Sequence, residues 1–476
     1  MKYILFILPV FLFMGACKKA LEEKPKSIAT ETFYNTAAEV QAAVNAAYYP
    51  LQSADGFGSY YTLFESCADN VYGKGSLAAI EEYKGYSTAN ISNMNAVWDQ
   101  LYLAVRNANL VIKNTPEGTR TTAEEKARFI GEARYVRALS YFFLVRIWGA
   151  VPLRIDTNMD IIDVGRNPVQ EVYGLIIDDL TYAEQNLPDV PRMLGCASKW
   201  VAKTLLADVH LTLRHWPEAR DKAKEVIDSG RFSLVEVSQP DDFEKIFGAD
   251  VLTTPEEIFY FKYNRQMGWS MMNFFHISGS GYKPYGANYF AFYTTSNNIF
   301  YKNWDDNDFR KQHDFYHWDI GLGDNTYLGK KFIDPNGSTN APNDWPIYRY
   351  AEVLLIYAEA ANRAAGGPTA DAVKYLNMVR RRAYGYNSTQ PSPVDFNIAD
   401  YDEESFFQLV FREKGYETIF ECKRWMDLVR TGQAKKFIKE TTGIDMAESM
   451  LLWPIPVGEI NYNKAMDPVR DQNPGY

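Results

Sequence analysis

Cysteine and histidine are scarce in this chain of 476 residues, which contains four cysteines and five histidines. Apart from Cys17, the cysteines are Cys67, Cys196 and Cys422, which are too few and too widely spaced for a disulfide framework or a zinc site. We therefore expect these three to be buried as small apolar side chains.

Patterns for binding a metal are incomplete. His313 and His317 have the i, i+4 spacing of two ligands on a helix, but no third ligand is identifiable, which favours incidental surface histidines. Asp156 begins a stretch that starts like a calcium loop, yet Ile161 stands where the turn needs glycine and Asn167 where a glutamate should close it. The sequence thus predicts no metal and no cofactor.

Catalytic motifs are missing as well. The chain lacks the His-Glu-x-x-His, Gly-x-Ser-x-Gly and phosphate-binding glycine-loop patterns, and the stretch 323–331 has the wrong spacing for the last of these. With 60 acidic residues, some pair will always resemble a glycosidase dyad, so proximity in the sequence proves nothing. We predict that the protein is not an enzyme.

The chain also has no excess of positive charge, and its formal net charge is −10. This balance argues against a nucleic acid as partner. The content of 46% hydrophobic and 23% charged residues is that of a folded globular protein rather than a disordered or fibrous one. Aromatic residues are abundant at 15%, more than a core requires, which suggests that some rings face a ligand.

The N-terminus carries the one notable apolar run of the sequence. Lys2 precedes about 11 apolar residues, too few to span a bilayer but suited to the core of a signal peptide. The run ends in Met-Gly-Ala-Cys at 14–17, which resembles a bacterial lipobox. We predict a signal peptide at 1–16, a lipidated Cys17 that anchors the protein, and a polar tether at 17–30. The alternative is an ordinary secretory signal with an incidental cysteine.

The body of the chain is predicted to be mainly α-helical, with the helices in pairs. Thr122 and Glu125 form a capping-box signature at the start of one helix. Each pair takes roughly 30–35 residues, close to the tetratricopeptide period of 34. A helical repeat scaffold is therefore expected, with an irregular helical bundle as the alternative. The paired segments are 90–113 with 122–148, 198–214 with 217–229, and 348–365 with 369–384.

The stretch 231–346 lacks helical periodicity, apart from a plausible strand at 257–263. Between positions 265 and 330, 17 of 66 residues are aromatic. A long irregular region inside a compact protein is usually functional, and rings mixed with amides and carboxylates suit a carbohydrate ligand. The alternative is that these rings pack the loops onto the helices. The candidate ligand-binding residues are Trp269, Tyr282, Tyr285, Trp304 and Trp318.

Several ordered motifs follow the lipobox-like start. They are EARYVRA at 132–138, YFFL at 141–144 with WGAVP at 148–152, RYAEVLL at 349–355 with AEA at 358–360, LNMVR at 376–380, the charged series Arg412-Glu413, Glu417, Glu421, Arg424, Asp427 and Arg430, and PIP at 454–456 with QNPGY at 472–476. Together they resemble the SusD/RagB family of Bacteroidota surface lipoproteins over essentially the whole mature chain. One departure is REKG at 412–415, which only approximates the family's Glu-Arg-x-x-Glu form.

The resemblance implies a fold and a role. Residues 31–476 would form a single SusD-like domain, with the landmark charges tying helices together through pairs such as Glu132 with Arg137 and Glu421 with Arg424. Family members lie on the outer face of the outer membrane as lids over a SusC-type TonB-dependent transporter. They bind oligosaccharides, or peptides in some members, without breaking bonds. By analogy, Asn70 and Tyr72 in the loop 66–75 are further ligand candidates, with an ordinary polar loop as the alternative.

Three hypotheses follow from the sequence. The first is a glycan-binding lid, the second is the same lid with a peptide or other non-sugar ligand, and the third is a surface glycoside hydrolase. The absence of a catalytic motif disfavours the third.

Overall fold

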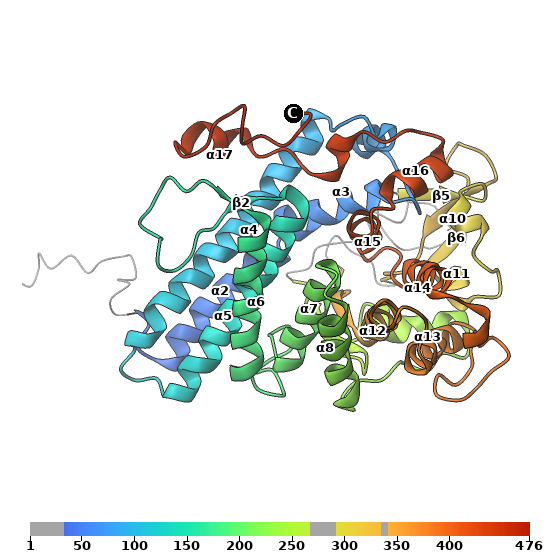
Figure 1. Cartoon of the computed structure of the whole chain (residues 1–476), viewed down its shortest axis with the longest axis horizontal. Coiled ribbons are helices and arrows are strands. Elements are labelled where there is room, and N and C mark those ends of the chain that lie inside the picture. Colours follow the sequence, from blue (N-terminus) through green and yellow to red (C-terminus); the bar gives the residue numbers. More distant parts are fainter. Residues whose placement is uncertain (1–32, 267–291, 335–340) are drawn as a thin grey trace, which may run out of the picture.

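Helices that follow one another in the sequence pack side by side in the computed structural model, which describes residues 33–266, 292–334 and 341–476 (Figure 1). Each helix packs on the next one in the series α4, α5, α6, α7, α8, α12 and α13. In addition, α2 packs on α4 and α5, and α14 packs on α12. The bounds are α2 Ala37–Gln52, α4 Thr88–Asn114, α5 Ala123–Trp148, α6 Val169–Asn186, α7 Lys199–Thr212, α8 Trp216–Asp228, α12 Tyr350–Ala365, α13 Ala370–Ala383 and α14 Glu403–Glu417. The predicted mainly α architecture of paired helices is confirmed.

Local sequence signals set most helix boundaries. Thr122 accepts a hydrogen bond from the backbone N–H of Glu125 at 3.2 Å, and the Glu125 carboxylate accepts one from the backbone N–H of Thr122 at 2.9 Å. This reciprocal capping box begins α5 where the sequence predicts it. The third pair differs, because Tyr348 and Arg349 belong to the strand β8 (Trp345–Arg349) and α12 begins only at Tyr350.

Shorter helices complete the structure and were not part of the predicted pairs. α3 lies in the middle of the molecule beside α15, and α16 and α17 belong to the C-terminal segment (Figure 1). Their bounds are α3 Ser59–Cys67, α15 Arg424–Arg430, α16 Ala434–Thr442 and α17 Val457–Tyr462.

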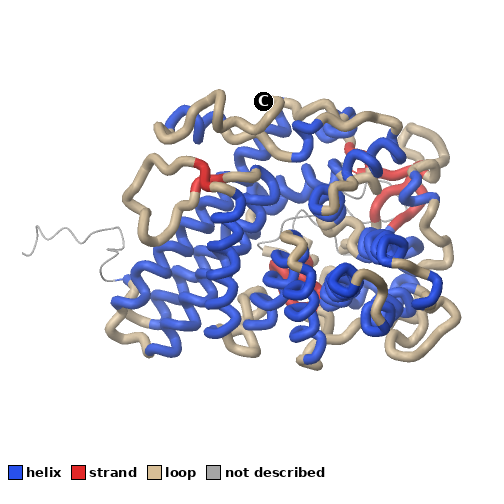
Figure 2. The backbone as a smooth tube through the Cα atoms, in the orientation of Figure 1, coloured by secondary structure: helices blue, strands red, loops and turns tan. Residues whose placement is uncertain are grey.

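The region predicted to be irregular contains strands and short helices (Figure 2). The predicted strand is β4, Glu257–Phe261, which pairs antiparallel with β8. A second sheet has the order β1-β5-β7-β6 and joins segments from distant parts of the chain. The further elements are β1 Tyr72–Gly73, β5 Phe292–Thr295, β6 Phe315–His317, β7 Thr326–Gly329, α9 Glu244–Phe247, α10 Ile299–Lys302 and α11 Phe309–Asp314. The region is thus more regular than its sequence suggests.

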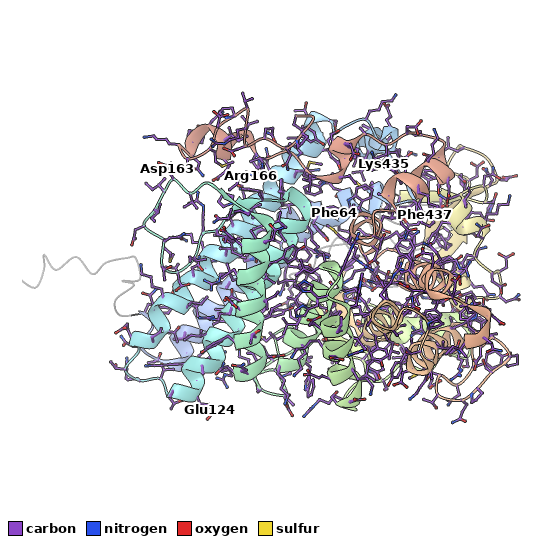
Figure 3. All side chains as sticks on the ribbon, in the orientation of Figure 1. Phe64, Glu124, Asp163, Arg166, Lys435 and Phe437 are labelled. Atoms are coloured by element: carbon purple, nitrogen blue, oxygen red, sulfur yellow. The ribbon has the colours of Figure 1, made fainter. Side chains whose placement is uncertain are left out.

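The C-terminal segment closes the fold against α5 and the short ladder of β2 (Val151–Pro152) with β3 (Arg166–Asn167). The Trp148 indole N–H donates to the Pro454 carbonyl at 3.0 Å. Arg166, labelled in Figure 3, donates to the Asp471 carbonyl at 2.7 Å and to the Asn473 side chain at 2.8 Å. One hydrophobic cluster of buried residues extends from Tyr34 to Met466, so both ends of the described chain join the same core.

Cys67, Cys196 and Cys422 are buried free thiols, as predicted. In the described ranges, none of the helices combines the length and apolar composition that a bilayer-spanning segment requires. The predicted signal peptide 1–16, the lipidation site Cys17 and the tether 17–30 lie outside the described residues.

Candidate ligand-binding surface

The sheet β1-β5-β7-β6 carries aromatic rings on the face turned away from the main core. Tyr72 lies opposite Tyr293 in the β1–β5 register, and Tyr316 lies opposite Leu328 in the β6–β7 register. Tyr316 and Leu328 form a small apolar cluster of their own, on which Tyr293 and Trp318 pack. We call these five side chains the outer sheet face. Because side chains alternate along a strand, their neighbours point the other way and join the main core.

The outer sheet face has a buried base and accessible rings. Tyr316 is 8% exposed and Leu328 is 0% exposed. Tyr72, Tyr293 and Trp318 are each only partly buried. The Tyr72 and Tyr293 ring centroids lie 5.4 Å apart, with the ring planes inclined by 40°. An apolar floor with rings that are partly accessible is an arrangement on which the flat face of a ligand can stack.

The loop after β6 is held in a defined conformation that positions Trp318. The Thr326 hydroxyl donates to the Trp318 carbonyl at 2.6 Å, and the Trp318 backbone N–H donates to the Thr326 carbonyl at 3.1 Å. Asp319 accepts from the backbone N–H groups of Gly321 and Gly323 at 2.7 and 3.0 Å. These two hydrogen bonds lower the pKa of the Asp319 carboxyl, because they stabilise its charged form. Trp318 therefore lies at the start of a turn whose conformation is held by hydrogen bonds.

The segment that precedes Tyr72 is anchored in the interior. The Asp69 carboxylate accepts two hydrogen bonds from the Arg424 guanidinium, at 2.7 and 2.8 Å. The Asp69 carbonyl accepts a further one from the Asn298 side chain at 3.1 Å. Asn70 is 0% exposed, so the prediction that its amide contacts a ligand is wrong in this structure. Its segment serves to hold β1, and with it Tyr72, in place.

Trp304 is likewise a core residue and not a ligand contact. Its side chain is 2% exposed, and its ring stacks on Tyr416 of α14 with the centroids 4.4 Å apart and the planes inclined by 12°. Phe300 and Phe315 pack edge-on against it. The alternative considered for the aromatic loops, that their rings pack onto the helices, holds for this residue. The predicted role of Trp304 is therefore corrected.

The other candidates divide into two groups. Tyr72 and Trp318 come from positions about 250 residues apart in the sequence, and the sheet brings both to its outer face. Trp269, Tyr282 and Tyr285 lie outside the described residues, so their roles stay predictions. Tyr293 was missed, although the alternation Phe-Tyr-Thr-Thr at 292–295 is a strand signal that could have revealed it.

A carboxyl group lies beside the two tyrosines. Burial raises the pKa of Glu81, at the end of a 3-10 helix (Gly75–Glu82), to about 8. Burial also raises the pKa of Tyr293 to about 12, and the nearby charge of Glu81 adds to that rise. The pKa of Tyr72 is raised as well, mainly by burial. A hydrogen bond with Asn298 lowers it, and the nearby charge of Glu81 raises it further. The outer sheet face is thus bordered by an acidic group that is readily protonated.

Buried ion pairs connect the sheet to the helical scaffold. The Arg310 guanidinium of α11 donates to Asp308 at 2.6 Å and to Glu417 of α14 at 3.0 Å. The Arg349 guanidinium donates to Glu417 at 2.7 Å and to Glu421 at 2.8 Å. Burial acts against the charge of Glu417, but the surrounding arginines hold its pKa well below the usual range.

The landmark charges therefore have the structural role expected of them, with different partners. Arg192 pairs with Glu132, whereas Arg137 pairs with Asp179 at 2.7 Å. Likewise Glu421 pairs with Arg349, and the partner of Arg424 is Asp69. Each predicted pair was within one local segment, but the structure satisfies each charge with a group far away in the sequence.

No metal centre is evident in the part of the chain that the structure describes, where no three histidine, cysteine or acidic side chains converge. His313 is buried between Asp314 and Glu244, with the ring nitrogens 2.7 and 3.3 Å from their carboxylate oxygens. His317 is exposed at the rim of the sheet. The i, i+4 pair considered from the sequence therefore does not form a joint site.

A groove of about 450 Å³ on the helical scaffold is a second surface that could hold a ligand. Its rings are already engaged, since Trp98 is 3% exposed and the Tyr102 hydroxyl donates to the Pro152 carbonyl at 2.8 Å. Arg154 in its wall is paired with Glu459. The outer sheet face offers more accessible ring surface and is the stronger candidate.

Comparisons with known proteins agree on one family. A family model described as the SusD family matches residues 259–476, and one described as starch-binding, associating with the outer membrane, matches residues 19–211. SusD-like protein P2 of Formosa agariphila is 28% identical over 100% of both chains.

Solved structures show the same fold. A SusD homolog from Bacteroides thetaiotaomicron superposes with a TM-score of 0.77 at 22% identity, over 94% of this chain and 98% of that one. Surface glycan-binding protein A from Bacteroides thetaiotaomicron superposes with a TM-score of 0.75 at 21% identity, over 94% of this chain and 100% of the other. With both parts of the sequence matched by SusD models and the fold shared over nearly its full length, the chain belongs to the SusD/RagB family.

Proposed function

We propose that this protein is a surface lipoprotein that binds oligosaccharides on its outer sheet face and acts as the lid of a SusC-type TonB-dependent transporter. The observation that carries the proposal is the set of partly buried rings of Tyr72, Tyr293 and Trp318 on a buried apolar floor. Sugar rings have flat apolar faces that stack on such side chains, while their hydroxyls need polar partners at the rim.

Family likeness supports this role. One similar structure is that of a surface glycan-binding protein, and the N-terminal family model describes starch binding in association with the outer membrane. The lipobox-like sequence ending at Cys17 would supply the anchor. The transporter and the identity of the ligand belong to the proposal alone.

The chemistry suits a carrier that must release its cargo. Each stacking contact is weak, so several rings have to share one ligand. We expect dissociation constants between about 1 μM and 1 mM, which correspond to about 8 and 4 kcal/mol of binding free energy. Binding without bond cleavage is sufficient for this role.

The test is affinity gel electrophoresis of the chain from Lys18 onward, which contains every described residue, against plant, host and microbial polysaccharides. We expect one glycan to retard the protein, and Trp318→Ala and Tyr293→Ala each to weaken binding about tenfold or more. Tyr462→Ala is the matched control, because that ring is 84% exposed but lies on α17, away from the sheet. Equal retardation of all variants would refute the outer sheet face as the site.

A failed glycan screen would point to the peptide alternative, which the same purified protein can test with a peptide library. Release of reducing ends from a retained glycan would instead support the hydrolase hypothesis. The lid role is tested separately by isolating the lipidated protein from outer membranes in mild detergent. We expect it to co-purify with a TonB-dependent barrel, and its recovery alone would contradict that part of the proposal.

A further inference from the structure

Two imidazole rings meet at the turn between α7 and α8. The Nδ1 atoms of His210 and His215 lie 3.4 Å apart, and the ring centroids are 5.6 Å apart. Both side chains reach solvent, since His210 is partly and His215 largely exposed. Neither residue takes part in the outer sheet face or in the buried ion pairs described above.

The backbone of the turn holds the two histidines at this separation. The backbone N–H of His215 donates to the carbonyl of His210 at 2.9 Å, and that of Arg214 donates to the carbonyl of Leu211 at 3.1 Å. These are the two hydrogen bonds of a Schellman motif, with Arg214 in the left-handed conformation at φ 60°. His215 is therefore folded back over the last turn of α7, and the approach of the rings follows from the end of the helix.

The spacing of the nitrogens matches that of two ligands on one metal ion. A divalent transition metal binds imidazole nitrogen at about 2.0–2.1 Å, and a tetrahedral angle then places two such nitrogens about 3.4 Å apart. We propose that His210 and His215 together bind a divalent transition-metal ion, such as Cu²⁺, Ni²⁺ or Zn²⁺, through their Nδ1 atoms. Any proton shared between the two Nδ1 atoms leaves to solvent when the metal binds.

Water completes the coordination shell. No third histidine, cysteine or acidic side chain converges on the pair in the ranges that the structure describes. Glu218 and Glu184 favour a cation near His210 through their charge, and Lys222 offsets part of this effect. A site with two protein ligands and open positions binds more weakly than a structural zinc site with four ligands. Cu²⁺ is expected to bind most tightly of the three ions, in line with the Irving–Williams order.

The experiment titrates each metal alone into the chain from Lys18 onward, in a buffer that does not bind metals, and follows heat by calorimetry. His276→Gln/His317→Gln is the background, since it removes the other histidines except the buried His313. In this background we expect one ion per chain, and His210→Gln or His215→Gln should each lower the affinity at least tenfold. The copper complex should also show coupling to two nitrogens in its electron paramagnetic resonance spectrum.

A structural control separates the ligands from the turn. Arg214→Gly keeps the left-handed position and relieves its strain, so it should fold at least as stably and bind the metal with unchanged affinity. If one histidine variant fails to fold, the other carries the test. Absence of saturable binding in the background, or affinity that is the same with and without His210 and His215, overturns the proposal.

Discussion

The helical scaffold and the sheet region of this protein differ in how far each relies on apolar contact and on charges placed in the interior. In the scaffold, α7 and α8 bury stripes of aliphatic and small side chains, among them Val201, Leu205, Ala219 and Ala223. In the sheet region the strands are two to five residues long, and fully buried arginines on neighbouring elements pair with carboxylates of α14. Strands that short are not stable alone. The candidate binding surface thus depends on short strands held by charges in the interior, whereas in the scaffold buried pairs such as Arg137 with Asp179 add to extended apolar contact between helices.

The largest effect should come from removing one of these buried cations. Arg310→Met removes the one guanidinium that Asp308, Glu413 and Glu417 share in the interior, which should lower the free energy of unfolding by about 4–5 kcal/mol. Urea denaturation measures the change. The control is Arg470→Met, because that arginine is exposed and its pair with Asp471 should contribute less than about 1 kcal/mol. Similar losses for the two variants would mean that the buried Arg310 stabilises the protein no more than an exposed arginine does.

Trp304→Ala should be nearly as costly, because it empties a packed site between the sheet and α14. We expect a loss of about 3–4 kcal/mol in the free energy of unfolding, from lost burial and the cavity left behind. Trp318→Ala, which removes a partly exposed ring, should cost no more than about 2 kcal/mol. Thermal and urea unfolding of both variants would show this order, and the reverse order would mean that Trp318 is the core residue.

Glu81 should make the sheet region sensitive to pH. Its pKa in the folded protein is about 8, above the value of about 4.3 for an unfolded chain, so the folded state retains the proton longer. The protonated Glu81 carboxyl therefore makes its full contribution to the free energy of unfolding below pH 4, and this contribution is lost as the pH rises toward 8. Glu81→Gln should therefore gain about 1–2 kcal/mol over the wild type between pH 5 and 8. Urea denaturation at several pH values measures the difference, and the same pH dependence of the free energy of unfolding in Glu81→Gln and the wild type would contradict the prediction. Glu82→Gln is the control, because Glu82 is exposed.

The smallest effect should come from the scaffold. Thr122→Ala removes the hydroxyl that caps α5, and we expect a loss of about 1 kcal/mol in the free energy of unfolding. Thr122→Ser keeps the hydroxyl and should stay within about 0.5 kcal/mol of the wild type. If the alanine variant lost as much as Arg310→Met, local capping and interior charge would rank equally, and the contrast between the two regions would fail.

Much of the scaffold could be predicted because its signals are local. The capping box at Thr122, the apolar periodicity of α7 and the glycine after α12 all lie within a few residues of the boundary they mark. The start of α12 could not be predicted, because Tyr348 is drawn into β8 by pairing with Phe259, almost 90 residues away. Partners such as Asp69 for Arg424 are distant in the same way.

The candidate site could be predicted only in part. A density of aromatic residues indicates that rings are present, but it does not say which ones are buried. Trp304 and Trp318 have the same side chain, and each is followed in the sequence by an aspartate. Nevertheless, Trp304 stacks on Tyr416 in the core, whereas Trp318 lies on the outer sheet face. Trp318 reaches the outer sheet face because of the pleat of β6 and the hydrogen-bonded turn that follows it.

By itself, the sequence determined the mainly helical fold, the pairing of its helices and the resemblance to the SusD/RagB family, since these follow from short-range periodicity and ordered motifs. Tertiary structure alone decided which charges pair in the interior and which rings reach the surface. The physical reason is that a sheet of short strands takes its register and its two faces from partners far apart in the chain, so that Tyr72, Tyr293 and Trp318 share one surface only after folding.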